Sequence, residues 1–228
     1  MPNIFFTSDT HFHHKNIVRG CSAWEPGTGP QRTRDFDTLE EHDGALVQNI
    51  NGAVKADDIL YHLGDWSFGG VDQIYAFRRQ LHCKNIHLIL GNHDHHIENN
   101  KEVVIFGEGI PYLIRLQPLF VEVRDKIRTR KIGGQTMTLD HFAQRTWEKA
   151  HHGNWCLYGH SHGTLPEYGT GPITGNVANT GWTEQYFKTT DVGIDTHPEF
   201  RPYHFDEIAA IMKNRIDLRV DHHNEKTN

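Results

Sequence analysis

Five short apolar segments of the chain are each followed at once by aspartate, asparagine or histidine. The segments and the residues that end them are 3–7 with Asp9 and His11, 59–63 with Asp65, 86–90 with Asn92, His93 and Asp94, 135–140 with His141, and 155–158 with His160 and His162. Each apolar segment has the length of a buried strand. Because the carboxyl ends of strands in an open α/β sheet face the crevice where ligands bind, we expect these polar residues to meet at one rim.

Imidazole, carboxylate and amide groups gathered at one rim are typical ligands of transition metals. Mixed nitrogen and oxygen ligands suit Mn, Fe, Zn or Ni better than Ca. Each motif alone has an ordinary structural explanation, since Gly-Asn-His-Asp is also a common turn composition. Their recurrence at five strand ends favours a metal site. The candidate ligands are Asp9, His11, Asp65, Asn92, His141, His160 and His162. Seven ligands exceed what one tetrahedral ion needs, so the sequence predicts two ions that share one carboxylate.

The remaining pattern predicts an α/β domain with mixed sheets. Asp37 is a candidate N-cap with Glu40 three residues later, and the helix that follows would end at Gly52. A second helix is expected over 71–81, and a last one from Asp206, with Ile208, Ile211, Met212 and Arg215 at helical spacing. Segments 127–132 and 135–140 flank Gly133-Gly134 and predict a hairpin. Strands that alternate with helices and are followed by hairpins favour mixed rather than purely parallel sheets.

Length and composition narrow the class of protein. The 228 residues predict one domain over 1–220, long loops over 20–35 and 163–182, and a disordered polar tail over 221–228. A net charge of −6 disfavours a general nucleic-acid coat protein. No apolar run approaches the ~20 residues that span a bilayer, and the start of the chain does not resemble a signal peptide. Cys21, Cys83 and Cys156 are far apart, which favours free thiols and a cytoplasmic location.

The ordered set of motifs resembles one known family. Asp-x-His, Gly-Asp, Gly-Asn-His-Asp, a single His and Gly-His-x-His resemble the signature of the calcineurin-like metallophosphoesterases over residues 4 to about 210. The small prokaryotic and phage members are the most similar, because Asp-Thr-His-Phe is followed closely by His14 and Asn16. The resemblance implies a four-layer α/β/β/α sandwich of two mixed β-sheets flanked by helices.

The resemblance also implies a role for each polar residue. Asp9, His11 and His162 would hold one ion, Asn92, His141 and His160 the other, and Asp65 would bridge them. Two divalent ions, Mn being the first choice with Fe, Zn or Ni as alternatives, would share a hydroxide that attacks phosphorus. His93 would act as general acid and protonate the departing alkoxide.

Two features of the sequence depart from the phosphoprotein phosphatases of this superfamily. They carry an aspartate three residues after the bridging one, where this chain has Phe68, and an Arg-Gly where it has Gly69-Gly70. We therefore do not expect a Ser/Thr protein phosphatase. His93 would be oriented by Asp94, by a backbone carbonyl, or less tightly.

Several nearby residues keep two interpretations. His14, Asn16 and Asp94 would contact substrate or support the metal ligands, whereas His13 is expected in an exposed loop. Trp66 and Phe68 would stack on a nucleobase or, more simply, pack under a loop. Arg124, Lys126, Arg128 and Arg130 alternate along a segment, which is typical either of a binding surface for a polyanion or of a solvated edge strand.

Three functions follow from these observations. The first is a metal-dependent phosphohydrolase that cleaves a small phosphomonoester or phosphodiester, a nucleotide or cyclic nucleotide being the expected substrate. The second is a nuclease with the same chemistry that binds RNA or DNA through Arg124, Lys126, Arg128 and Arg130. The third is a non-catalytic scaffold with the same fold, which the retention of His93 and all seven ligands disfavours. The sequence leaves the oligomeric state open and gives no sign of a membrane partner.

Overall fold

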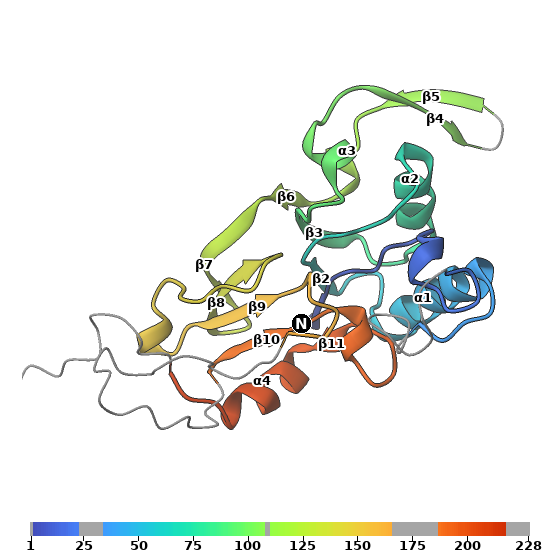
Figure 1. Ribbon diagram of the computed structural model, residues 1–228. Helices are drawn as coiled ribbons and strands as arrows, with labels where there is room; N and C mark the ends of the chain where they lie inside the picture. The colour runs from blue at the N-terminus through green and yellow to red at the C-terminus, as the bar shows by residue number, and fades with distance from the viewer. Residues whose placement is uncertain (1, 23–33, 108–109, 166–186, 218–228) are drawn as a thin grey trace, which may run out of the picture.

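The structure, a computed structural model, describes residues 2–22, 34–107, 110–165 and 187–217 (Figure 1). Most of the predicted loops 20–35 and 163–182, and the whole tail 221–228, lie outside the described residues. Within the described ranges, no helix is long and apolar enough to cross a membrane.

The first sheet has five strands in the order β11-β1-β2-β3-β6. Their bounds are Tyr203–His204 for β11, Ile4–Thr7 for β1, Ile59–His62 for β2, Asn85–Ile89 for β3 and Glu122–Arg124 for β6. β1, β2, β3 and β6 pair in parallel, and β11 pairs with β1 in the antiparallel direction. The polar residues that follow β1, β2 and β3 therefore leave the sheet at the same edge.

The second sheet has four strands in the order β10-β9-β8-β7. Their bounds are Thr189–Asp191 for β10, Trp155–Tyr158 for β9, Gln135–Asp140 for β8 and Lys126–Ile132 for β7. β8, β9 and β10 are parallel neighbours, and β7 forms the predicted antiparallel hairpin with β8. Both sheets are mixed, so the predicted α/β class is confirmed.

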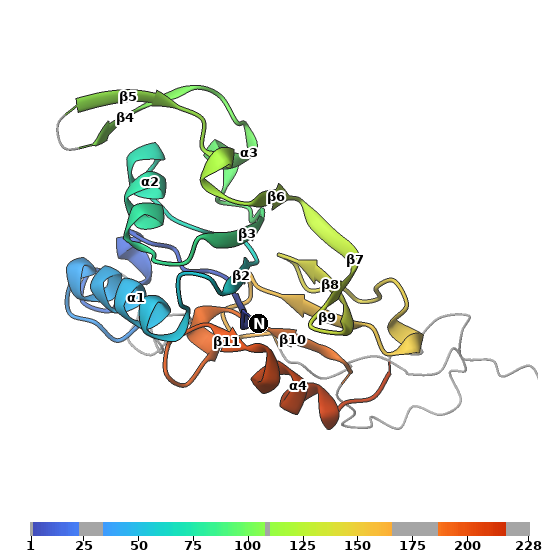
Figure 2. The ribbon, with the colours of Figure 1, turned by 180° about the vertical axis from the view of Figure 1, so that it is seen from behind.

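The two sheets face each other, and helices cover the outer side of the first (Figures 1 and 2). Side chains alternate along a strand, so Phe5 packs with helices α1 (Leu39–Ala53) and α2 (Val71–Gln80), whereas Phe6 packs with the second sheet. Helix α4 (Phe205–Lys213) places Ile208 and Met212 in the cluster between the sheets.

The layer outside the second sheet, which is expected from the sequence to be helical, is not built from an α-helix in the described residues. On the outer face of the second sheet, Cys156 is covered by Trp147, Ala150 and Phe187. In this region the described residues contain only a 3₁₀ turn, η4 (Ala150–His152). All three cysteines are free, as predicted.

Several short elements have no counterpart among the sequence predictions. β4 (Val103–Gly107) and β5 (Ile110–Ile114) form a separate hairpin over α2, at the top of both views (Figures 1 and 2). Other unpredicted elements are the strands β6, β10 and β11, the turn η4, and further short pieces: the helix α3 (His95–Glu98) and the 3₁₀ turns η1 (Lys15–Ile17), η3 (Gln117–Leu119) and η5 (Ile194–Thr196). The last helix ends earlier than expected: Arg215 lies beyond it, and its guanidinium donates to the carbonyl of Phe187.

The N-cap of helix α1 lies one residue later than predicted. Thr38 is the N-cap, and its hydroxyl accepts a hydrogen bond from the Glu41 backbone N–H at 3.1 Å. The Glu41 carboxylate accepts in return from the Thr38 backbone N–H at 3.2 Å. Asp37, the predicted cap, instead accepts from Arg19 at 2.6 Å. Both pairs of residues have the spacing of a capping box, and in the structure it is Thr38 and Glu41 that form it.

Replacing Thr38 tests this assignment of the cap. Thr38→Ala removes the acceptor of one helix N–H and should lower the free energy of unfolding by about 1 kcal/mol. Asp37→Ala, the matched control, should leave the urea midpoint nearly unchanged, since its carboxylate is exposed. The reverse ranking of the two midpoints would show that Asp37 is the cap.

Candidate metal centre

The loops that follow β1 and β2 run side by side. The Asp9 backbone N–H donates to the Gly64 carbonyl at 2.9 Å, and the His11 backbone N–H donates to the backbone carbonyl of Asp65 at 3.0 Å. The loop that follows β3 joins them at Gly91, where a Cβ would lie 2.2 Å from Asp65 Oδ1. Only glycine permits this approach.

Five of the seven predicted ligands have a left-handed backbone. Their φ angles are 54° for Asp9, 44° for His11, 57° for Asp65, 68° for His160 and 47° for His162. A residue with a Cβ adopts this conformation at an energetic cost, and such residues cluster at functional sites. The turns redirect both His160 and His162 toward the rim.

A first group is formed by Asp9, His11 and His162, whose ligand atoms lie within 4.8 Å of one another. Asp9 Oδ1 is 3.9 Å from His11 Nε2 and 4.0 Å from His162 Nε2. The other oxygen, Asp9 Oδ2, accepts from the Ser8 hydroxyl at 2.5 Å and the His160 backbone N–H at 2.8 Å. Asp9 Oδ1 is buried and has no hydrogen-bond partner among the described residues.

A second group is formed by Asp65, His141 and His160, under the same 4.8 Å limit. Asp65 Oδ2 is 3.5 Å from His141 Nε2. The amide oxygen of Asn92 is 3.0 Å from both His141 Nε2 and His160 Nδ1. The amide oxygen of Asn92, a predicted ligand, therefore lies beside this group.

Asp65 stands between the two groups. Its Oδ2 is 3.4 Å from His11 Nε2 in the first group and 3.5 Å from His141 Nε2 in the second. Its Oδ1 accepts from the His93 backbone N–H at 2.9 Å. One oxygen is thus held by the protein and the other faces both groups, which is the placement of a bridging carboxylate.

Two histidines are oriented by the nitrogen that faces away from the centre. His141 Nδ1 donates to the Leu63 carbonyl at 2.8 Å, and His162 Nδ1 is 2.8 Å from Asp195 Oδ2. Proton donation from Nδ1 leaves the Nε2 lone pair available to a cation. Both Nε2 atoms face a carboxylate of their group.

The buried groups of Asp9 and His11 fit a cation in the first group. Burial raises the pKa of the Asp9 carboxyl and lowers the pKa of the His11 imidazole well below its ordinary value. A buried carboxylate oxygen without a partner carries a large desolvation cost. A divalent ion within reach of Asp9 Oδ1 would offset that cost and would favour the neutral imidazole and the ionised carboxylate together.

His93 lies at the rim and is held by ring contacts. Its ring is 5.3 Å from that of Phe68, edge to face, and 5.4 Å from that of His11. Phe68 in turn stacks on His14 at 3.9 Å. Within the described part of the chain, no group hydrogen-bonds to the ring nitrogens of His93. Phe68 thus positions His93 by packing, where the phosphoprotein phosphatases have a carboxylate.

Asp94 supports Asp65 rather than the ring of His93. Its carboxylate accepts from the backbone N–H groups of Asp65 at 2.9 Å, Trp66 at 2.9 Å and Gly91 at 2.8 Å. Burial raises the pKa of Asp94 to about 7. The carboxylate ties the loop after β2 to the loop after β3.

The structure also shows the surroundings of Trp66, His13 and Asn16. Trp66 is fully buried and donates to the Ile74 carbonyl at 3.3 Å, so its packing interpretation is confirmed. His13 is exposed, as predicted, and its ring contacts Asp43 at 3.3 Å. Asn16 is exposed in η1. Its side chain makes no hydrogen bond to the ligand residues in the described ranges.

The basic residues of β6 and β7 do not form one continuous row. Arg124 and Arg130 both bind Glu122, at 2.8 Å and 2.6 Å, and Lys126 is 4.0 Å from Asp140. A register shift between residues 127 and 130 also breaks the alternation. Much of this positive charge is balanced within the protein, which fits the solvated-edge interpretation.

Sequence reasoning missed a buried ion pair under the first group. Arg34 is fully buried and donates to the Thr10 carbonyl at 2.9 Å, to the Asp9 carbonyl and to Asp195 at 2.5 Å. Asp195 also binds His162. Arg34 and Asp195 are 161 positions apart, and neither belongs to a motif, so the sequence carried no signal for the pair.

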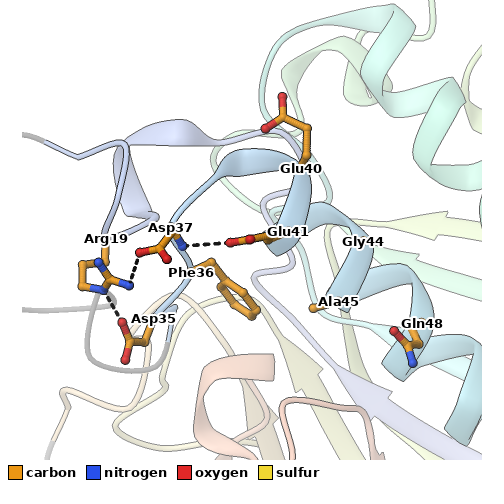
Figure 3. Close-up of a pocket in the computed structure, with 9 residues that line it drawn as sticks. All are labelled: Arg19, Asp35, Phe36, Asp37, Glu40, Glu41, Gly44, Ala45 and Gln48. Carbon is orange, nitrogen blue, oxygen red and sulfur yellow. Dashed lines mark hydrogen bonds and ion pairs between the residues drawn. The ribbon is translucent and has the colours of Figure 1, made fainter.

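A hollow of about 460 Å³ lies at the start of α1, away from the predicted ligands (Figure 3). Its polar groups are mostly paired with one another: Arg19 binds Asp35 and Asp37, and Glu41 caps the helix. Because these groups already bind one another, we assign no ligand to this hollow.

Comparisons with known proteins give relatives without an assigned activity. No family model matches the chain. It is 29% identical over 171 residues to an uncharacterized protein of Methanocaldococcus jannaschii, and the aligned region covers 74% of each chain. It is 33% identical over 103 residues to the gene 66 protein of Mycobacterium phage L5, and this aligned region covers 41% of each chain.

A solved structure has a similar fold. A protein of unknown function from Aquifex aeolicus superposes with a TM-score of 0.58 and covers 92% of this chain and 100% of its own. The identity is 19%, so the likeness concerns the fold alone.

The buried ion pair makes a testable contribution to stability. Arg34→Met leaves the Asp195 carboxylate buried without its cation and two carbonyls without a donor, and should lower the free energy of unfolding by about 3–5 kcal/mol. Urea unfolding measures the change. The matched control is Arg19→Met, which removes an exposed ion pair and should hardly move the midpoint. Equal midpoints for the two variants would contradict the assignment.

Proposed function

We propose that this chain is a dinuclear-metal-dependent phosphohydrolase of the calcineurin-like type. The observation that carries the proposal is the position of Asp65 Oδ2, 3.4 Å from His11 Nε2 and 3.5 Å from His141 Nε2. A carboxylate shared in this way supports two ions side by side. Manganese is the first choice because the ligands mix imidazole, amide and carboxylate, and Fe, Zn and Ni are the alternatives.

The chain's own residues divide the work. Asp9, His11 and His162 would hold one ion, Asn92, His141 and His160 the other, and Asp65 both. Two such ions supply a water-derived nucleophile at neutral pH and charge that stabilises the phosphoryl oxygens. His93 donates a proton to the departing alcohol, for which Phe68 and the backbone bond to Asp65 hold it at the rim.

A small phosphate ester is the substrate that these observations favour, either a phosphomonoester or a phosphodiester, with a nucleotide or cyclic nucleotide as the expected kind. The balanced charges on β6 and β7 weaken the nuclease alternative. The convergence of all seven ligands with His93 weakens the scaffold alternative. The free cysteines support a reducing compartment such as the cytoplasm.

Metal content tests the centre independently of turnover. The purified chain, stripped by chelator and reloaded with Mn²⁺, should bind two ions by elemental analysis and calorimetry. Asp9→Ala should lose one ion, whereas Asp65→Ala should weaken both. Asp206→Ala, at the exposed start of α4, is the control and should keep two. Fewer than one ion on the wild-type chain would refute the centre.

Turnover of two esters tests the role of His93. His93→Ala should lower the rate of alkyl phosphate esters by roughly 10²–10⁴-fold, with metal content unchanged, because their alkoxide needs a proton to leave. A nitrophenyl ester, whose leaving group departs without a proton, should lose much less. His95→Ala, on the neighbouring helix α3, serves as the control.

Two outcomes would contradict the proposal in different ways. Equal losses on the alkyl and nitrophenyl esters would exclude His93 as the acid. A wild-type chain that binds two ions and hydrolyses no generic phosphoester would favour the scaffold.

A further inference from the structure

A groove of about 380 Å³ opens beside the second group of candidate ligands. Asn92, whose amide oxygen lies beside that group, lines the groove together with Leu90 and Gly91. Phe142 lines it as well. The volume lies within the range of sites for small organic molecules.

Phe142 is an exposed ring fixed against the candidate ligands. It is 48% exposed, and its ring is 4.9 Å from that of His141 and 4.6 Å from that of His160. Its backbone N–H donates to Asp140 Oδ1 at 3.1 Å, which holds the turn after β8. A large apolar side chain with this exposure beside a polar centre offers a surface on which a flat ring can stack.

His93 belongs to the other part of the rim. Its ring contacts are with Phe68, His11 and His14, whereas those of Phe142 are with His141 and His160. The leaving alcohol must lie beside His93 to receive its proton. A group in the groove beside Phe142 is therefore a different part of the ester, which stays on phosphorus.

The charges around the groove exclude some candidates for this retained part. Three carboxylates, those of Glu98, Asp125 and Asp140, line the groove against a single cation, Lys126. Lys126 is itself 4.0 Å from Asp140. The net negative charge of the groove would repel a further phosphate, whereas it would not repel an uncharged polar group.

We propose that the substrate is a phosphodiester whose retained arm is uncharged and carries a flat ring, as a nucleoside does, and that this ring stacks on Phe142. The inference rests on the proposed function for the reaction, but the stacking site itself does not require the metals. In the reaction, the phosphorus–oxygen bond to the leaving alcohol breaks and a bond to the oxygen of water forms. His93 gives its proton to the alcohol, and the nucleoside leaves as its monophosphate.

Binding of a free nucleoside tests the stacking site without any turnover. Adenosine and uridine, titrated into chelator-treated protein and followed by ligand-observed NMR, should bind with an affinity that Phe142→Leu lowers roughly 5- to 150-fold. Phe142→Tyr keeps the ring and should retain binding. Phe106→Ala removes a more exposed ring from the β4–β5 hairpin and should have no effect.

Kinetics with two diesters test the arm that is retained. The p-nitrophenyl diester of a nucleoside 5′-phosphate and p-nitrophenyl methyl phosphate share the leaving group and differ only in that arm. Phe142→Leu should raise KM for the nucleoside ester by a similar factor, roughly 5- to 150-fold, with kcat unchanged. It should leave KM for the methyl ester within about twofold, a change that corresponds to less than 0.5 kcal/mol.

The outcomes separate this inference from the proposed function. Nucleoside binding that depends on Phe142, in a chain without Mn²⁺-dependent turnover, would refute the phosphohydrolase and keep the stacking site. Turnover with equal KM values for Phe142→Leu and wild type on the nucleoside ester would refute the stacking site alone. Equal rises in KM on both esters would show that Phe142 only shapes the centre.

Discussion

The shared carboxylate of Asp65 is the interaction on which the arrangement of the centre depends. One oxygen is fixed by the backbone of His93, and the other lies between His11 and His141. Asp9 has the same division, with one oxygen held by the protein and the other left without a partner. Burial raises the pKa of the Asp9 carboxyl, and repulsion from Asp65 adds to this effect, so a cation at Asp9 Oδ1 would favour the ionised form.

Supporting groups hold this arrangement against backbone strain. Asp9 and Asp65 both have positive φ angles, which cost energy unless their surroundings fix them. Asp94 binds three backbone N–H groups of the loops after β2 and β3, and Arg34 binds the carbonyls after β1. Donors and acceptors on fixed backbone thus position the candidate ligands, which would reduce the reorganisation that binding of an ion requires.

The strand ends could be predicted because apolar runs and the polar residues that follow them are local features. All seven predicted ligands meet at the rim for that reason. The N-cap of α1 was predicted one residue early, since Asp37 and Thr38 are both competent caps and each has a glutamate three residues later. The pair of Arg34 and Asp195 could not be predicted, because its partners come together only through the tertiary fold.

The two exposed rings of the rim act in different ways. Phe68 stacks on His14 and contacts His93 with part of its ring, which packs against the histidine proposed as general acid. Phe142 contacts His141 and His160 with part of its ring, is 48% exposed and lines the groove. Leucine in place of Phe142 would preserve an apolar contact with these two imidazoles but not a stacking face, so packing against the histidines and stacking in the groove are separable effects of the ring.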